Sequence, residues 1–163
     1  MRIPLELSVD SVADAVKRVN AYGKSVEAKC DEFTRRLVEL GVEVAKVTVR
    51  KDTGELESGI RFEKVADGEY LVISEGEYAI FVEFGTGVIG QGTYPGELPA
   101  GYGYDERRTP AAHDPIDPTK WYYRDRYGAI RSTRGQTANA YMATSAEEMR
   151  QAVLATAKEV FRT

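Results

Sequence analysis

The fold depends on one stretch in the middle of the chain, Tyr78-Ala79-Ile80-Phe81-Val82-Glu83-Phe84-Gly85-Thr86-Gly87. Every second residue from Tyr78 to Phe84 is apolar, as in a strand, whereas Tyr78, Phe81 and Val82 would share one face of a helical turn. Both structures remain open from the sequence. The two glycines that end the stretch predict a positive φ or a close approach of two backbone segments.

A second stretch built around a glycine turn comes about thirty residues earlier, Asp52-Thr53-Gly54-Glu55-Leu56-Glu57-Ser58-Gly59-Ile60. The residues that follow Gly59 alternate between apolar and charged side chains, which predicts a half-buried strand. Asp67-Gly68 is a strong signal for a two-residue hairpin turn. The sequence therefore predicts an antiparallel hairpin whose returning strand covers residues 69–74, within a region of strands and glycine turn at 55–87.

A long helical region precedes these strands, over residues 8–50. Its apolar residues alternate at spacings of three and four, which places them on one helical face; they are Val12, Val16, Val19, Gly23, Val26, Cys30, Phe33, Leu37, Leu40, Val44 and Val47. We expect Ser11 to cap a short helix over 10–22, Gly23 to break it, and a second helix to cover 24–49. Because the flanking charge pattern of a coiled coil is weak, we expect this face to pack on the sheet, with Cys30 in the core.

The second half of the chain begins with a long loop. Residues 88–119 contain five glycines, five prolines and three tyrosines without any period, which predicts a long mobile loop. A hairpin is expected at 120–134, with its turn at Tyr127-Gly128, and a helix at 138–162, either capped by Ser145 or carrying Ser145 inside it. Together these elements predict one α+β domain over residues 1–163, with the two helical regions packed on a small antiparallel sheet.

Composition excludes several classes of function. The net charge of −4 argues against tight nucleic-acid binding by phosphate neutralisation. Residues 120–134 hold five basic residues and one acid. This segment is either a solvated hairpin or a surface that lies near DNA or an acidic partner. Because the chain has only one cysteine and one histidine, a multi-cysteine zinc site and a histidine-based relay are excluded. We see no membrane span and no signal peptide, and we expect the protein to be made and used in the cytoplasm.

The chemical motifs each have a simpler structural explanation. The glycines around Thr86 lack the Lys-Ser/Thr pair of a phosphate-binding loop. Glu83 has no second carboxylate or histidine beside it, so we expect a buried or inter-subunit hydrogen bond to backbone N–H groups of the neighbouring turn. His113, Asp114 and Asp117 suggest a divalent cation, but the adjacent prolines favour turn formation. We therefore expect no catalytic residue, cofactor or metal.

Tyrosines are frequent in the loop and the second hairpin. They would stack on bases in a nucleic-acid-binding protein, but their glycine and proline neighbours favour an adaptable protein-binding surface; they are Tyr94, Tyr102, Tyr104, Tyr122, Tyr123 and Tyr127. Ser58 lacks the flanking glycines of a nucleophile elbow.

The motifs and their order resemble a family of minor structural, neck or tail-completion proteins of long-tailed bacteriophages. The resemblance covers about residues 25–160, including 121–128 and 135–142, which are similar to versions from phages and prophages of Gram-positive bacteria. Relatives often have Pro-Phe at Ala140-Tyr141, and a proline shortly before Asp52. The interaction residues that the resemblance implies are Thr53, Gly54, Leu56, Tyr78, Ala79, Val82, Glu83, Phe84, Gly85, Thr86, Gly87, Trp121, Tyr122 and Tyr141.

The resemblance implies a non-enzymatic virion component at the head–tail junction that assembles as a homo-oligomeric ring. Its partners would be copies of itself and other phage neck or tail proteins, with DNA only as passing cargo and no membrane. A protein- or nucleic-acid-binding adaptor that uses the tyrosine-rich loop is the alternative, and a small hydrolase that uses Glu83 with loop carboxylates is a third reading.

Overall fold

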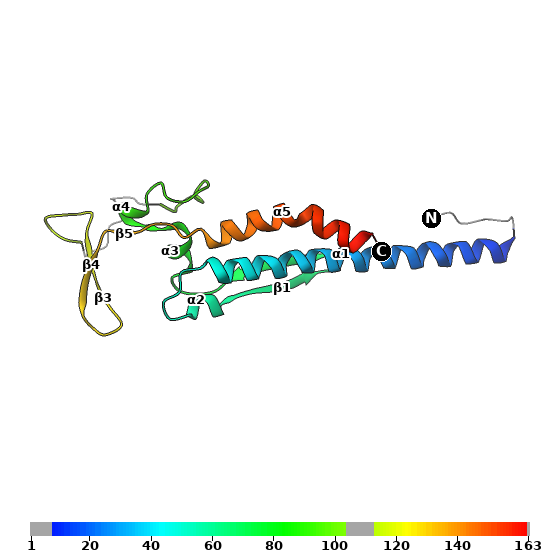
Figure 1. Cartoon of the computed structure of the whole chain (residues 1–163), viewed down its shortest axis with the longest axis horizontal. Helices are drawn as coiled ribbons and strands as arrows, with labels where there is room; N and C mark the ends of the chain where they lie inside the picture. Colours follow the sequence, from blue (N-terminus) through cyan, green and yellow to red (C-terminus); the bar gives the residue numbers. More distant parts are fainter. Residues whose placement is uncertain (1–7, 104–112, 163) are drawn as a thin grey trace.

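The computed structural model describes residues 8–103 and 113–162, and its shape is elongated (Figure 1). One long helix lies at the centre, with a β-hairpin along one side and the last helix antiparallel to it along the other. The expected α+β class is confirmed. In chain order the elements are α1 (Val9–Thr48), α2 (Glu55–Ser58), β1 (Ile60–Ala66), β2 (Glu69–Ser74), α3 (Ala79–Phe84), α4 (Gly87–Gly90), β3 (Trp121–Arg124), β4 (Ile130–Thr133), β5 (Gly135–Gln136) and α5 (Tyr141–Phe161).

The N-terminal helical region is one helix, so the expected break at Gly23 is wrong. A glycine inside a helix costs only about 1 kcal/mol relative to alanine, and α1 continues through it without interruption. The expected cap at Ser11 is also wrong by three residues, because the Ser8 side chain accepts the hydrogen bond from the Ser11 backbone N–H. At about 1.5 Å per residue the 40-residue helix is about 60 Å long.

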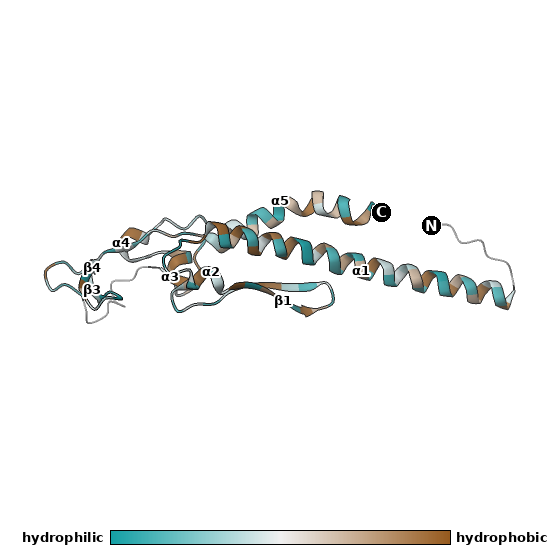
Figure 2. Ribbon diagram, turned by 60° about the horizontal axis from the view of Figure 1, so that its bottom comes forward, coloured by the Kyte–Doolittle hydropathy of each residue, from teal (hydrophilic) through white to brown (hydrophobic). Residues whose placement is uncertain are grey.

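The expected sheet-packing stripe of α1 is corrected in two ways. In the C-terminal half the buried positions are Val38, Gly41 and Ala45, which lie beside the stripe rather than on it. In the N-terminal half Val12, Val16 and Val19 of the stripe are exposed, and Cys30 is exposed as well rather than in the core. Figure 2 shows why: the N-terminal half of α1 projects beyond the ends of α5 and the β1–β2 hairpin.

The two long helices pack closely at a glycine. The Ser145 hydroxyl of α5 donates a hydrogen bond to the Gly41 carbonyl of α1 at 2.7 Å. A Cβ at Gly41 would lie 2.5 Å from the Met149 sulfur, so the absence of a side chain there lets the helices approach. The contact ends near Phe33 and Phe161, whose ring centroids are 6.1 Å apart.

The β1–β2 hairpin has the predicted turn, because Ala66 pairs with Glu69 across Asp67-Gly68. One acidic side chain of α1 fixes the turn in place. The Asp31 carboxylate accepts hydrogen bonds from the Gly68 backbone N–H at 3.0 Å and the Tyr70 hydroxyl at 3.1 Å, and it pairs with Lys64 at 2.8 Å. These donors hold the pKa of Asp31 below its usual value, with the Lys64 interaction the largest cause.

The core forms where the C-terminal end of α1 meets the start of α5. It is built from the buried side chains of Ala45, Val49, Ile60 and Tyr141, with Val42, Leu56, Val82 and Met142 packed against them. The Tyr141 hydroxyl shares a 2.7 Å hydrogen bond with Ser74, which joins α5 to β2. Burial raises the pKa of Tyr141 above its usual value.

Residues 88–134 leave this body and return to it at one point, which we call the neck. Thr86 pairs with Gln136 and Gly87 with Gly135 as antiparallel bridges. The backbones are so close that a Cβ on Gly87 would lie 2.3 Å from the Arg134 carbonyl oxygen. Gly85 and Gly87 both have positive φ, so both expectations for these glycines hold.

Candidate functional site

The Tyr78–Phe84 stretch, left open from the sequence, forms the short helix α3, and its two faces have different roles. Ala79 and Glu83 are buried on the inner face. Tyr78, Ile80 and Phe81 are exposed on the outer face. The stretch is therefore both a part of the core and a part of the surface.

Glu83 caps the last helix. Its two carboxylate oxygens accept hydrogen bonds from the backbone N–H groups of Met142 at 2.9 Å and Ala143 at 3.0 Å. These N–H groups belong to the first turn of α5, where a helix has no internal acceptor for them and where negative charge is favoured. The backbone groups are those of the last helix, rather than of the glycine turn that follows Glu83 in the sequence.

Ala140, where the resemblance leads us to expect proline, precedes α5 in a left-handed conformation with φ 50° and ψ 35°. No other non-glycine residue among those described has a positive φ. Its backbone N–H donates to the Glu83 carbonyl oxygen at 3.0 Å, a hydrogen bond that proline cannot make. The chain therefore enters α5 by a geometry that a proline would not permit.

Asn139 holds the end of α1 against the start of α5. Its side-chain amide donates to the Thr48 carbonyl at 3.2 Å, and its side-chain oxygen accepts from the Arg50 backbone N–H at 2.9 Å. These two hydrogen bonds fix the chain where it leaves α1. Sequence reasoning missed this role of Asn139, because its partners lie about ninety residues away in the chain.

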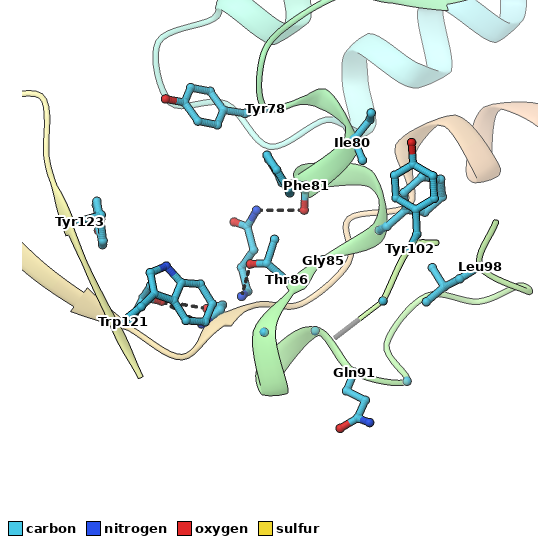
Figure 3. A pocket seen from close by; sticks show the side chains of 18 of the residues that line it. Tyr78, Ile80, Phe81, Gly85, Thr86, Gln91, Leu98, Tyr102, Trp121 and Tyr123 are labelled. Carbon is cyan, nitrogen blue, oxygen red and sulfur yellow. Dashed lines mark hydrogen bonds between the residues drawn. The ribbon is translucent and has the colours of Figure 1, made fainter. Parts of the chain in front are cut away.

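An apolar groove lies between α3, the loop over residues 91–103 and the β3–β4 hairpin (Figure 3). Its volume is about 1030 Å³. The side chains that give it its apolar character are Ile80, Phe81, Phe84, Leu98, Tyr102, Trp121 and Tyr123. Aromatic contacts fasten the loop to α3, since the Phe84 ring lies 4.9 Å from Tyr94 and 5.2 Å from Tyr102 between centroids. This groove is the candidate functional site.

Trp121 forms the wall of the groove next to the neck. A Cβ on Gly87 would lie 2.6 Å from the Trp121 ring, so the indole lies directly on the backbone of the glycine turn. The Gln136 side chain donates a hydrogen bond to the Phe81 carbonyl at 3.1 Å. The motif that ends α3 and the tryptophan of the hairpin thus meet in one place.

The remaining motif residues lie away from the groove. Leu56, Val82 and Tyr141 meet in the core. Gly54, with φ 81°, precedes the one-turn helix α2, and the Thr53 hydroxyl accepts a 3.3 Å hydrogen bond from the Glu55 N–H. Tyr122 lies outside the groove lining and donates to Asp114 at 2.6 Å. The segment Thr53–Leu56 therefore supports the fold, whereas residues of the Tyr78–Gly87 stretch and Trp121 line the groove.

The carboxylates considered for a metal are occupied by turn formation. One Asp114 oxygen accepts the backbone N–H groups of Ile116 and Asp117, and one Asp117 oxygen accepts that of Thr119. The Tyr122 hydrogen bond, followed by the two backbone hydrogen bonds, lowers the pKa of Asp114 to about 2. Residues 8–103 and 113–162 contain no cluster of three or more potential metal ligands.

The basic residues of the second hairpin are largely neutralised. Carboxylates pair with four of the five: Lys120 with Asp114, Arg126 with Asp52, Arg131 with Asp125 and Arg134 with Asp117. The guanidinium of the fifth, Arg124, donates to the Gly128 carbonyl. The hairpin therefore presents less free positive charge than its sequence indicates.

Residues 13–85 match the model of the HK97-gp10-like family, described as "Bacteriophage HK97-gp10, putative tail-component". The resemblance to a family of phage structural proteins is confirmed. The HK97-gp10-like region covers somewhat less than half of the chain, from α1 to Gly85 at the neck. A comparison with curated proteins and one with solved structures gave no match. None of the helices in the described residues has the length and apolar composition of a membrane span.

Tyr104, one of the tyrosines of the loop, lies outside the described residues. Gly135 is visible in the sequence only as a glycine, because its bridge partner, Gly87, is set by the tertiary fold.

Proposed function

We propose that this protein is a non-enzymatic structural component of a bacteriophage virion, and that copies of it form a ring at the head–tail junction for tail completion or head–tail joining. The observation that carries the proposal is the match of residues 13–85 to a family described as a phage tail component. The exposed apolar surfaces at both ends of the molecule support it, because an assembling subunit needs such surfaces.

The geometry around Glu83 favours a structural role over hydrolysis. Both of its oxygens accept backbone N–H groups, and the side chain is only 5% exposed. A general acid or base must reach the proton of its substrate, and a carboxylate engaged in this way does not.

The charge of the protein supports the proposal that DNA only passes through the ring and is not bound tightly by it. The net charge is −4, and ion pairs occupy most of the basic side chains of the second hairpin. Salt-sensitive binding of duplex DNA by the purified protein would contradict this part of the proposal.

The test is a deletion of the gene in the phage or prophage that encodes it. We expect unjoined heads and tails in the deletion, and rescue by the wild-type gene in trans. We also expect gold-labelled antibody at the head–tail junction of purified wild-type virions. Normal virions from the deletion, together with no label on wild-type particles, would contradict the proposal. An adaptor that acts in the cell outside the virion would give that result.

A further inference from the structure

The β3–β4 hairpin forms one wall of the apolar groove, but beyond its base it is not packed against the rest of the molecule. Tyr122 and Tyr123 are adjacent in β3, so their side chains point to opposite faces of the hairpin, and they are 40% and 49% exposed. Ile130, at the start of β4, is exposed as well. Figures 1 and 2 show the hairpin standing apart from both long helices. Apolar burial therefore does not hold either face of it in place.

The base of the hairpin is fixed at the neck. The Trp121 indole of β3 lies on the backbone of Gly87. Arg134, which follows β4, pairs with Asp117 at 2.6 Å. The chain then reaches Gly135, whose φ of 108° lies in a region that favours glycine. Because a few residues of this kind can absorb the backbone rotation of a hinge, the neck is suited to act as a pivot.

One ion pair joins the tip of the hairpin to the body. The Arg126 guanidinium lies 3.0 Å from the Asp52 carboxylate, and the two side chains are 56% and 79% exposed. Among the described residues, the other hydrogen bonds of the turn at 125–129 stay within the hairpin, and the Asp125 carboxylate accepts several of them. The tip is therefore attached to the body at a single place.

The acidic partner in this ion pair follows a well-anchored segment. The guanidinium of the nearby Arg50 donates to the Thr137 carbonyl at 3.1 Å and to the Thr137 hydroxyl at 2.6 Å. The Arg50 backbone N–H donates to the Asn139 side chain at 2.9 Å. These hydrogen bonds keep Asp52 close to the end of α1, where it meets the tip of the hairpin.

The position of the hairpin bears directly on the groove. Trp121 and Tyr123 line it from the hairpin, whereas Ile80 and Phe81 line it from α3. A rotation of the hairpin about the neck therefore changes the width of the groove. An ion pair as exposed as the one at the tip changes an equilibrium by about fivefold at most, and salt weakens it. The tip can thus be released without the unfolding of any helix or strand.

We propose that the β3–β4 hairpin is a hinged wall of the groove, which pivots at the neck and is latched in its closed position by the ion pair between Asp52 and Arg126. Release of this latch swings the hairpin away from α3 and widens the groove. The inference goes beyond the proposed function and does not depend on it, because it concerns a motion within one chain.

The test measures the distance between the hairpin and the body by pulsed electron–electron double resonance of two spin labels. The labels are attached to Val47→Cys on α1 and Ile130→Cys on β4, both at exposed positions. Cys30→Ser removes the native exposed thiol from this parent protein. Dilution with unlabelled protein confines the measured distances to single chains. Circular dichroism and thermal unfolding establish that every variant is folded.

We expect the parent at low salt to show mostly one short distance. Arg126→Ala, or about 1 M sodium chloride, should shift the ratio of closed to open chains by up to about fivefold toward a longer and broader distance. Exchange of the two charges, in Asp52→Arg with Arg126→Asp, should restore the short distance. Arg131→Ala is the matched control, because it removes the same charge from the hairpin but its partner, Asp125, also lies in the hairpin. It should leave the ratio unchanged.

Two results would overturn the latch. One is a distance that changes neither in Arg126→Ala nor at high salt, and the other is an equal change in Arg131→Ala, which would show a general effect of charge. Hydrogen exchange tests the pivot, since the amides of β3 and β4 should be equally protected in Arg126→Ala and in the parent. Loss of their protection would mean that the hairpin unfolds rather than swings. Because purified protein is used, these results are independent of the virion labelling that tests the proposed function.

Discussion

Glu83 and Met142 are 59 residues apart in the chain, yet a carboxylate oxygen of Glu83 lies 2.9 Å from the backbone nitrogen of Met142. A side chain from the helix that ends in the glycine turn thereby caps the helix that ends the protein. This contact joins the HK97-gp10-like region to α5, which lies outside the family match.

Loss of this cap should destabilise the protein. Hydrogen bonds to a charged group contribute about 1.5–3 kcal/mol, so we expect Glu83→Ala to lower the free energy of unfolding by about 3 kcal/mol and Glu83→Gln by less, since the amide keeps one acceptor. Urea denaturation followed by circular dichroism measures both. Glu77→Ala, at an exposed position, is the control. Equal stability of Glu83→Ala and Glu77→Ala would show that the cap contributes nothing.

The neck should be intolerant of side chains. A Cβ at Gly135 would lie 1.8 Å from the Thr86 carbonyl oxygen, whereas a Cβ at Gly92 would meet no atom within 4 Å, although both residues have positive φ. We expect Gly135→Ala to open the neck, and Gly92→Ala to cost only the left-handed conformation, about 1–2 kcal/mol. Limited proteolysis and hydrogen exchange across residues 86–90 and 134–138 report the opening. Equal protection in the two variants would contradict this prediction.

Ala140 offers a test of backbone geometry. Proline there requires φ near −65° and removes the hydrogen bond to the Glu83 carbonyl, so we expect Ala140→Pro to cost about 3 kcal/mol. Glycine accepts φ 50° without strain but loses a buried methyl group, so Ala140→Gly should change stability by less than about 1 kcal/mol. Thermal unfolding compares the pair. A stable Ala140→Pro protein would mean that α5 can begin by a second geometry.

The turn around Asp114 should be sensitive to acid. Its pKa is about 2 in the folded chain and 3.8 for an unperturbed carboxyl, so it adds stability above about pH 4 that is lost as the pH falls toward 2. Tyr122→Phe removes the largest cause of the shift and should raise the pKa of Asp114. Fluorescence of Trp121, the single tryptophan, follows the titration locally. Asp114→Asn should flatten the profile between pH 4 and 2, and an unchanged profile would contradict the assignment.

Local patterns predicted the elements well where the signal lies within a few residues. Asp67-Gly68 fixed the hairpin turn because two adjacent residues determine it. The α1 stripe was correctly predicted as helical, but its burial was not, because spacing shows that residues share a face and cannot show what covers it. Cys30 illustrates this limit: it lies on the stripe and is exposed.

The site was less predictable than the fold. The glycines of the Gly85-Thr86-Gly87 turn signalled close approach, but the approaching segment, Gly135-Gln136, is about fifty residues away in the chain. The groove combines α3 with the second hairpin, and no local pattern joins those two elements. Glu83 was expected to bind backbone N–H groups, but only the fold identifies them as those of α5.

The neck also bears on how such a protein can change over generations. The family match stops at Gly85, where residues 88–134 depart, and the chain rejoins the body at Gly135 and Gln136. Because both ends of the excursion are held at one point, its length can grow or shrink without moving α1 or α5. A phage lineage could therefore exchange this segment as a cassette, adapting the subunit to new neighbours while its scaffold is inherited intact.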